Sequence, residues 1–125
     1  MNKQILLKNL ILFLSIMFFV LSLVTLFNAP LILEVFEMAY SEGVGRNTQI
    51  TQIAGFFFGL ATLSFLGIKR NNPVLLQVGA LIFMFAFGVR ILAVFTSEAG
   101  FAPYFITPLI CSLILYQGAK SIKSN

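Results

Sequence analysis

One apolar stretch, from Pro73 to Phe95, limits what this chain can fold into more than any other feature. It is long enough to cross a lipid bilayer as an α-helix, which takes about 20 residues, and Arg90 is its one charged residue. A guanidinium inside an apolar span costs free energy, so it needs a partner, a route to the polar headgroups or a function. We therefore expect a membrane helix at about 73–95 and take Arg90 as a candidate functional residue.

Three other apolar stretches of similar length accompany it, at about 10–27, 50–68 and 102–119. Of the 125 residues, 59% are hydrophobic and 10% are charged, whereas a soluble domain carries about 25% charged residues. The first stretch is longer than the apolar core of a signal peptide, about 7–15 residues, so we expect it to remain as a helix. The sequence thus predicts an all-α fold, a single integral membrane domain over 1–125 built as a four-transmembrane-helix antiparallel bundle.

The positive charges predict how these helices are oriented. They flank the four stretches on one side: Lys3, Lys8, Lys69, Arg70, Lys120 and Lys123. The loop between the first two stretches instead carries Glu34, Glu37 and Glu42 against Arg46. Because loops rich in Lys and Arg stay in the cytoplasm, we expect both termini to be cytoplasmic and the acidic loop to face out.

That outer loop contains a segment with helical spacing, at about 30–40. Glu34 and Glu37 recur on one face, and Leu31 and Val35 on another. An amphipathic helix of this kind lies in the membrane surface rather than across it. We expect a short outer interfacial helix here, with an irregular loop as the alternative.

Small residues line one face of the second predicted helix. Gly55 and Gly59 form the small-xxx-small pattern that lets two membrane helices approach closely. The same face also carries Thr48, Gln52 and Thr62. We call the two glycines together with these three residues the glycine face. Packing inside the bundle and packing against a second copy of the chain both fit this pattern.

The other predicted helices carry comparable stripes. Ala86 and Ala93 flank Arg90 on one face of the third helix, which leaves that face narrow enough to pack against a neighbour. Small or weakly polar residues recur at similar spacing in the first helix (Ser15, Ser22, Thr25) and in the fourth (Pro108, Ser112, Ala119). Since lipid supplies no hydrophobic drive for helix association, we expect these stripes to hold the bundle together.

Arg90 belongs to a polar cluster at the outer end of the predicted bundle. It precedes the end of its helix by roughly 7 to 8 Å at 1.5 Å per residue. Gln49 and Gln52 enter the second helix from the same side, and Glu34 and Glu37 lie in the outer loop. We call these five residues the outer cluster.

Two interpretations of the outer cluster stay open. In the first, Arg90 is structural: it pairs with Glu34 or Glu37, or its long side chain reaches lipid phosphate. Removing one member of a buried ion pair costs about 3 to 5 kcal/mol, so a purely structural pair would matter to the fold. In the second, Arg90 binds the carboxylate or phosphate group of a ligand, and Gln49 and Gln52 donate hydrogen bonds to it.

The residues that are missing exclude several classes of function. There is no His and one Cys, Cys111, which excludes an internal disulfide, a Cys/His zinc site and a Ser–His or Cys–His catalytic pair. Acidic residues do not follow one another across the spans, so a proton relay is not expected. The cations lie in short clusters between apolar runs and do not form a nucleic-acid-binding face. We therefore predict no enzyme activity, no catalytic residue, no metal site and no cofactor.

Several short motifs, taken in order, resemble a family of small four-helix bacterial integral membrane proteins catalogued as a domain of unknown function. They span roughly residues 28–118: the run AGFFFG at Ala54–Gly59, the basic turn at Lys69 and Arg70, the run GVR ending at Arg90, Glu98 to Gly100, Pro103 and Pro108. The resemblance implies the same architecture, a bacterial inner (cytoplasmic) membrane location and a match of Arg90 to the family's arginine in the third helix. It brings no activity.

The chain also departs from that family. Members often carry an arginine and a Tyr-Gly-Gly run entering the second helix, where this chain has Gln49, Gln52 and then Ala54 and Gly55. They often carry a glutamate in the fourth helix, where this chain has only Ser112 and Gln117. The resemblance therefore does not extend to a charge network around Arg90.

These observations favour a small non-enzymatic membrane protein, an accessory or scaffold subunit of a larger membrane assembly that packs through the glycine face. Its expected partners are the lipid bilayer and a membrane protein or a second copy of the chain. The alternative function is binding or transport of an amphipathic, anionic small molecule or lipid at an outward-facing pocket around Arg90.

The predicted orientation can be tested with a reporter fusion. Alkaline phosphatase fused after Tyr40 is expected to be active in a bacterium, because the acidic loop would carry the enzyme to the outer side of the membrane. Enzyme activity measured in whole cells checks this, and an inactive but stable fusion would contradict the orientation.

Overall fold

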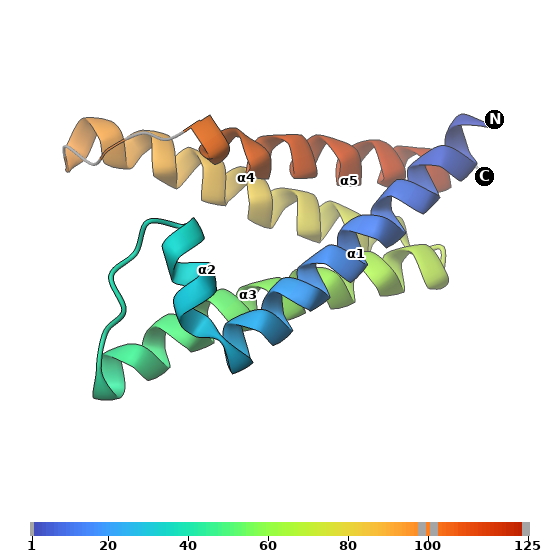
Figure 1. Cartoon of the computed structure of the whole chain (residues 1–125). Coiled ribbons are helices and arrows are strands. Elements are labelled where there is room, and N and C mark those ends of the chain that lie inside the picture. Colours follow the sequence, from blue (N-terminus) through green and yellow to red (C-terminus); the bar gives the residue numbers. More distant parts are fainter. Residues whose placement is uncertain (1, 98–99, 101–102, 124–125) are drawn as a thin grey trace. The chain divides into compact units, whose positions relative to one another are not determined.

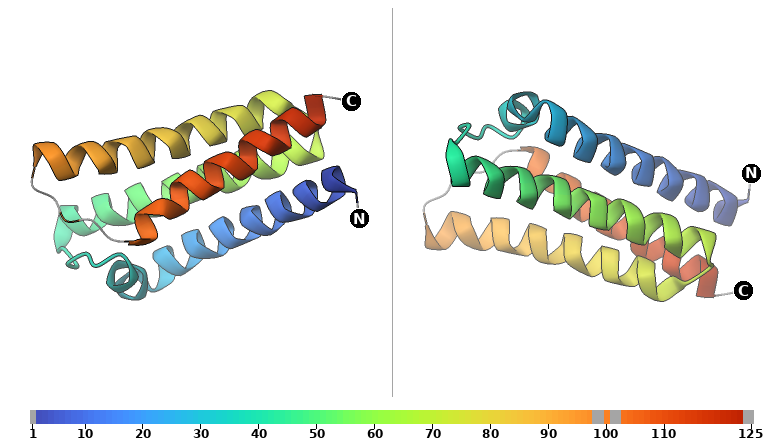
Figure 2. Two further views of the ribbon diagram at one scale, coloured as in Figure 1. Left: turned by 90° about the horizontal axis from the view of Figure 1, so that it is seen from above. Right: turned by 90° about the horizontal axis from the view of Figure 1, so that it is seen from below.

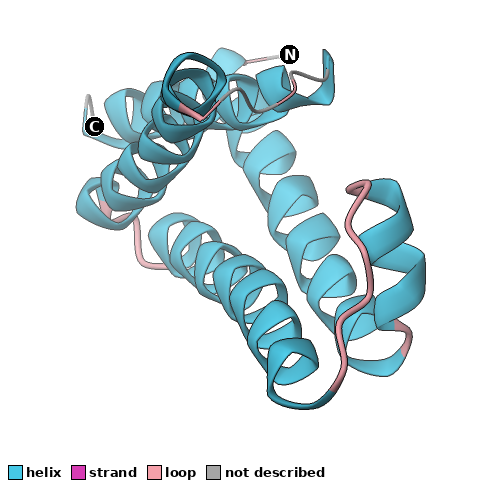
Figure 3. Cartoon of the chain, turned by 90° about the vertical axis from the view of Figure 1, so that its left-hand side faces the viewer, coloured by secondary structure: helices cyan, strands magenta, loops and turns pink. Residues whose placement is uncertain are grey.

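The computed structural model describes residues 2–97, 100 and 103–123, and every regular element among them is a helix (Figure 3). The predicted all-α class is therefore confirmed. A short 3-10 helix, η1 (Pro103–Ile106), precedes the last of the α-helices. The α-helices are labelled in Figure 1: α1 (Lys3–Phe27), α2 (Ala29–Val35), α3 (Gly43–Lys69), α4 (Pro73–Thr96) and α5 (Thr107–Lys123).

Three of these helices, α1, α3 and α4, are long and apolar enough to cross a membrane. This is what an integral membrane protein requires, and it agrees with the first three predicted spans. The helix α5 has 17 residues, which is at the lower edge of the range of about 17–25 for a spanning helix. Glu98 and the predicted start of the fourth span at 102 lie outside the described residues, and the fourth span stays a prediction.

The outer loop is less helical than its spacing predicted. The helix α2 ends at Val35 rather than near Tyr40 because Glu37 adopts a left-handed conformation, with φ at 57°. The Glu37 N–H donates to the Glu34 carbonyl over 3.0 Å, and the Met38 N–H donates to the Leu33 carbonyl over 2.8 Å. This pair of bonds is a Schellman motif, which closes a helix. Glu34 and Glu37 therefore do not share a helix face.

The connection from α3 to α4 is the tight turn that the sequence predicts. Asn71 has a φ of 48°, and the Asn72 N–H donates to the Gly67 carbonyl over 2.9 Å, so α3 also ends in a Schellman motif. The Asn72 side chain then accepts a 3.0 Å hydrogen bond from the Val74 N–H and caps α4. Pro73 occupies the first turn of α4, where its missing N–H costs nothing.

The chain forms two compact units, residues 1–12 with 63–125 and residues 13–62, and each is described by itself. In the first, α4 and α5 run antiparallel and side by side (Figure 2). The Ser112 hydroxyl donates a 2.8 Å hydrogen bond to the Ala80 carbonyl across this contact. Leu115 is fully buried against Gly79, and Gly118 lies against the Ile11 side chain of α1.

In the second unit, aromatic rings and a hydrogen bond connect α1 and α3. The Ser22 hydroxyl of α1 lies 3.2 Å from the Ala54 carbonyl of α3. Phe57 stacks on Phe18 of α1, with ring centroids 5.7 Å apart, and on Phe36, which follows α2, at 6.4 Å. The predicted stripes in the first and fourth helices are largely confirmed, since the following members are buried: Ser15, Ser22, Thr25, Ser112 and Ala119.

The turn between α3 and α4 provides a test of this packing. A Cβ atom at Gly67 would lie 2.6 Å from Cδ2 and 2.7 Å from Cγ of Leu76, a side chain that is fully buried, so the neighbouring core would have to shift. We expect Gly67→Ala to lower the free energy of unfolding by about 1–3 kcal/mol, as overpacking does. Thermal unfolding in a mild detergent measures the change.

The matched control for that substitution is Gly88→Ala in α4. A Cβ atom at Gly88 would meet nothing within 4 Å, and alanine favours a helix over glycine by about 1 kcal/mol. This variant is expected to unfold at the wild-type temperature or above it. Equal unfolding temperatures for the two variants would show that Gly67 is not tightly packed.

Candidate functional site

Arg90 lies in the last two turns of α4, where its side chain is half-buried. Its guanidinium carbon is 4.2 Å from the ring centroid of Phe105, which belongs to η1. A guanidinium at this distance is attracted by the negative face of the ring, by about 0.5–1 kcal/mol at exposed sites and about 2 kcal/mol where water is excluded. Among the described residues, no hydrogen bond or ion pair to the Arg90 guanidinium is seen.

The alanines on either side of Arg90 are half-buried. Ala86 and Ala93 precede and follow it by one helical turn, so they share its face of α4. Neither extends past its Cβ atom, and this leaves room for the Phe105 ring beside the guanidinium. A planar guanidinium has five N–H donors, so a ring beside it leaves donors for a carboxylate or phosphate group.

The other four members of the outer cluster all belong to the unit 13–62, whereas Arg90 belongs to the other unit. Each part is therefore described on its own, and a contact between Arg90 and the other four residues stays a prediction. Glu34, Glu37 and Gln52 are exposed. Gln49 has local partners on both ends of its amide, since Nε2 donates to the Ala39 carbonyl over 2.7 Å and Oε1 accepts from the Ser41 N–H over 3.0 Å.

The Gln49 contacts fasten the outer loop to the start of α3, a role that the sequence did not suggest. Arg46 contributes to the same fastening. Its Nε donates a 3.0 Å hydrogen bond to the Ser41 carbonyl, and its guanidinium carbon lies 4.3 Å from the Tyr40 ring centroid. Backbone carbonyls in an irregular segment carry no residue signature, which is why a sequence pattern could not have revealed these bonds.

The glycine face of α3 is open. All five of its residues are exposed, and a Cβ atom at Gly55 or Gly59 would meet nothing within 4 Å. The glycines that approach other side chains closely are elsewhere, at Gly45, Gly67, Gly79 and Gly118. The small-xxx-small pattern predicted which face is smooth, but it does not say which surface lies against that face.

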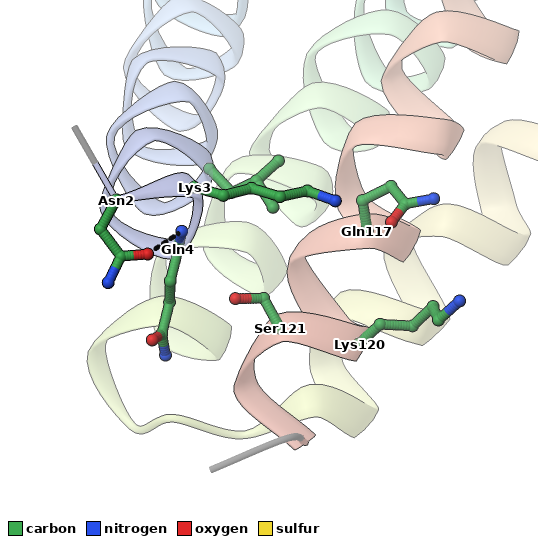
Figure 4. A pocket seen from close by; sticks show the side chains of 7 residues that line it. Asn2, Lys3, Gln4, Gln117, Lys120 and Ser121 are labelled. Carbon is green, nitrogen blue, oxygen red and sulfur yellow. Dashed lines mark hydrogen bonds between the residues drawn. The ribbon is translucent and has the colours of Figure 1, made fainter.

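A polar pocket of about 370 Å³ lies where the start of α1 meets the last turns of α5 in the first unit (Figure 4). Its lining is polar apart from one leucine: Asn2, Lys3, Gln4, Leu7, Gln117, Lys120 and Ser121. Nearby, the Lys8 ammonium donates a 3.1 Å hydrogen bond to the Asn71 side chain of the turn before α4. Sequence reasoning used these lysines only as orientation signals and missed the pocket.

These features describe a helical protein of the membrane class, because three of its helices are candidate membrane spans. It also has an arginine beside an aromatic ring and a polar pocket lined by two lysines. No group of three or more His, Cys, Asp or Glu that could hold a metal ion is found in the part of the chain that the structure describes. Comparisons with protein-family models, curated proteins and solved structures give no match. The resemblance to the small four-helix family stays a prediction.

Proposed function

We propose that this chain is a small, non-enzymatic accessory or scaffold subunit of a larger membrane assembly. In this proposal α5 is the fourth membrane span, both termini are in the cytoplasm of a bacterium, and α2 lies at the outer surface of the inner membrane. The resemblance to a four-helix family supports the architecture and brings no activity. One observation carries the function, which is that the glycine face of α3 is smooth, weakly polar and open.

The open glycine face matters because of how helices associate in lipid. Lipid tails are as apolar as leucine, so association depends on close van der Waals contact and on hydrogen bonds between helices. Gly55 and Gly59 would let a second backbone approach without moving any side chain, since neither has an atom within 4 Å of a Cβ position. Gln52 adds an exposed amide on the same face, and a polar group in a membrane favours a partner that can bond it.

The contacts of the other glycines support a partner outside the chain. Gly79 of α4 faces Leu115 of α5, and Gly118 of α5 faces Ile11 of α1, so these two glycines already pack against neighbouring helices. The glycine face is thus a surface of the same kind that has no such neighbour among the described residues. A partner helix with small residues of its own would complete it.

A substitution that fills this face tests the proposal. A Cβ atom added at Gly55 or Gly59 meets nothing within 4 Å, so in Gly55→Leu/Gly59→Leu the fold should persist while the partner helix is kept away. We expect a protein partner that copurifies with the wild type in mild detergent to be lost, at least tenfold, from the variant. Quantitative mass spectrometry of the purified complexes measures this.

The control for the glycine face is Gly88→Leu, which places the same side chain at an open glycine of another helix. This variant should retain the partner. Retention of the partner by Gly55→Leu/Gly59→Leu, or a wild-type protein that purifies as a monodisperse oligomer of itself alone, would contradict the accessory-subunit proposal.

The contact of Arg90 with Phe105 favours a second candidate function. A half-buried guanidinium beside a ring, with N–H donors left over, suits the headgroup of an amphipathic, anionic molecule whose apolar part lies in the membrane. Exposed apolar side chains near the same end of α4, Val89 and Leu92, offer a surface for that part. Binding or transport of such a small molecule or lipid is therefore our alternative proposal.

The alternative predicts a specific loss in Arg90→Gln. The uncharged amide keeps hydrogen-bonding capacity but removes the charge-assisted bonds that hold a carboxylate or phosphate. We expect the variant to fold and to lose an anionic lipid or small molecule that copurifies with the wild type, as seen by mass spectrometry of extracted ligands. The control Arg46→Gln removes a charge from the start of α3 and should keep the ligand, whereas equal ligand content in all three proteins would contradict the alternative.

A further inference from the structure

The loop between α2 and α3, residues 36–42, has no regular structure and is held against α3 by side chains (Figure 1). We call this segment the strap. The Gln49 amide bonds it twice, because Nε2 donates to the Ala39 carbonyl over 2.7 Å and Oε1 accepts from the Ser41 N–H over 3.0 Å. The Arg46 Nε donates a 3.0 Å hydrogen bond to the Ser41 carbonyl. Two side chains about one turn apart on α3 therefore bond three backbone groups of the strap.

These contacts are of a kind that opens more easily than the helices on either side. The bonds from Gln49 to Ala39 and from Arg46 to Ser41 are exposed, so water competes for both. The strap then meets α3 at Gly43, which has a φ of 57° and nothing within 4 Å of a Cβ position. Residues at the end of an element can act as hinges by absorbing a change in φ and ψ. A segment with few exposed bonds opens locally while the packed helices stay folded.

The strap lies beside the glycine face and does not cover it. At 3.6 residues per turn, Gly45, Arg46 and Gln49 are on average about 100° around α3 from the centre of the glycine face. The strap comes closest at Gly45, where a Cβ atom would lie 3.1 Å from the Ser41 Cβ. Thr48, the first member of the glycine face, belongs to the same turns of α3 and is exposed. The contacts with Arg46 and Gln49 thus hold the strap on a neighbouring side of the helix.

A released strap is long enough to reach the glycine face. Residues 36–42 span at most about 23 Å when extended, whereas Thr48 lies about 7 to 8 Å along α3 from Gly43. The strap carries the apolar side chains of Met38 and Tyr40, which are 41% and 39% exposed. A smooth face offers these side chains a surface to cover.

We propose that Gln49 and Arg46 form a latch that holds the strap to one side and so keeps the start of the glycine face open to a partner helix. The Arg46 guanidinium also lies over the Tyr40 ring, 4.3 Å from its centroid, which adds a fourth contact to the latch. Opening the latch lets the strap close over Thr48. This inference rests on the accessory-subunit function, since it assigns a regulation to the same face.

Amide exchange of the full chain in a mild detergent, resolved at Ser41 by NMR, measures release of the strap. In Gln49→Ala the Ser41 N–H loses its acceptor. We expect Ser41 to exchange about tenfold faster, since one hydrogen bond changes an opening equilibrium by up to about that factor, while the α1 and α3 amides keep wild-type exchange. Wild-type exchange at Ser41, or faster exchange throughout α3, would contradict the latch.

Two more variants frame this measurement. Asn47→Ala removes another exposed amide at the start of α3, whose contact is with Thr51 of the same helix, and should leave Ser41 exchange unchanged. Gly45→Leu pushes against the Ser41 Cβ and should speed Ser41 exchange although both latch side chains remain. Equal exchange in Asn47→Ala and Gly45→Leu would show that the strap is not held where the latch proposal requires.

Cysteine labelling measures whether the released strap closes. Thr48→Cys places a thiol at the start of the glycine face, and a water-soluble maleimide is the probe. The chain without this substitution gives the background from the buried Cys111. Adding Gln49→Ala should slow labelling about threefold, which corresponds to a strap that covers the thiol about two-thirds of the time, and adding Asn47→Ala should not. Equal or faster labelling after Gln49→Ala would overturn the proposal.

The latch and the accessory-subunit function fail in different ways. If Gly55→Leu/Gly59→Leu loses the copurified partner while Gln49→Ala keeps it, the function stands and the latch is wrong. If Gly55→Leu/Gly59→Leu keeps the partner, the function is wrong. The labelling experiment needs no partner, so it decides in either case whether the strap closes.

Discussion

The structure depends on helices approaching each other where a serine hydroxyl meets a backbone carbonyl. Ser22 reaches Ala54 in one unit and Ser112 reaches Ala80 in the other, at 3.2 and 2.8 Å. Such contacts require small residues on both sides, because a larger side chain would keep the backbones apart. In a chain with so little polar surface, the Ser112 hydroxyl also satisfies its own hydrogen-bonding need by this contact. The Ser22 hydroxyl instead shares its proton with the Phe18 carbonyl of its own helix, 2.9 Å away.

The sequence allowed the all-α class, the three long apolar helices and most of the buried stripes to be predicted, because each depends on hydrophobic length or on spacing along one helix. The end of α2 could not be predicted in this way. Glu37 adopts a left-handed conformation that favours glycine or asparagine, so a glutamate at this position does not predict the end of the helix. The glycine face has the same limit: the residue spacing predicts a smooth surface but does not predict which helix packs against it.

Arg90 shows how the chemistry of a site can be predicted while its partner is missed. A guanidinium in an apolar span needs a group that compensates its charge, and the sequence analysis predicted a carboxylate, lipid phosphate or an anionic ligand. The structure adds a neighbour that the sequence did not suggest, the Phe105 ring, whose centroid lies 4.2 Å from the guanidinium carbon, while the pairing with a carboxylate stays a prediction. With Phe at 15 positions, no single ring stands out in the sequence, and η1, which holds this one, has no periodic signature. An aromatic ring compensates a cation more weakly than a carboxylate does, so the guanidinium keeps its capacity to bind an anion.

The lysines at the start of α1 and the end of α5 illustrate what a charge pattern alone does not predict. The rule that cations stay in the cytoplasm predicts one side of the membrane for these lysines, so their presence alone carries no information about a ligand. The fold adds that α5 returns to the start of α1, where the two helix ends line one polar pocket with three amides and a hydroxyl. Side chains that a charge pattern treats only as orientation signals can therefore also line a polar pocket where two helix ends meet.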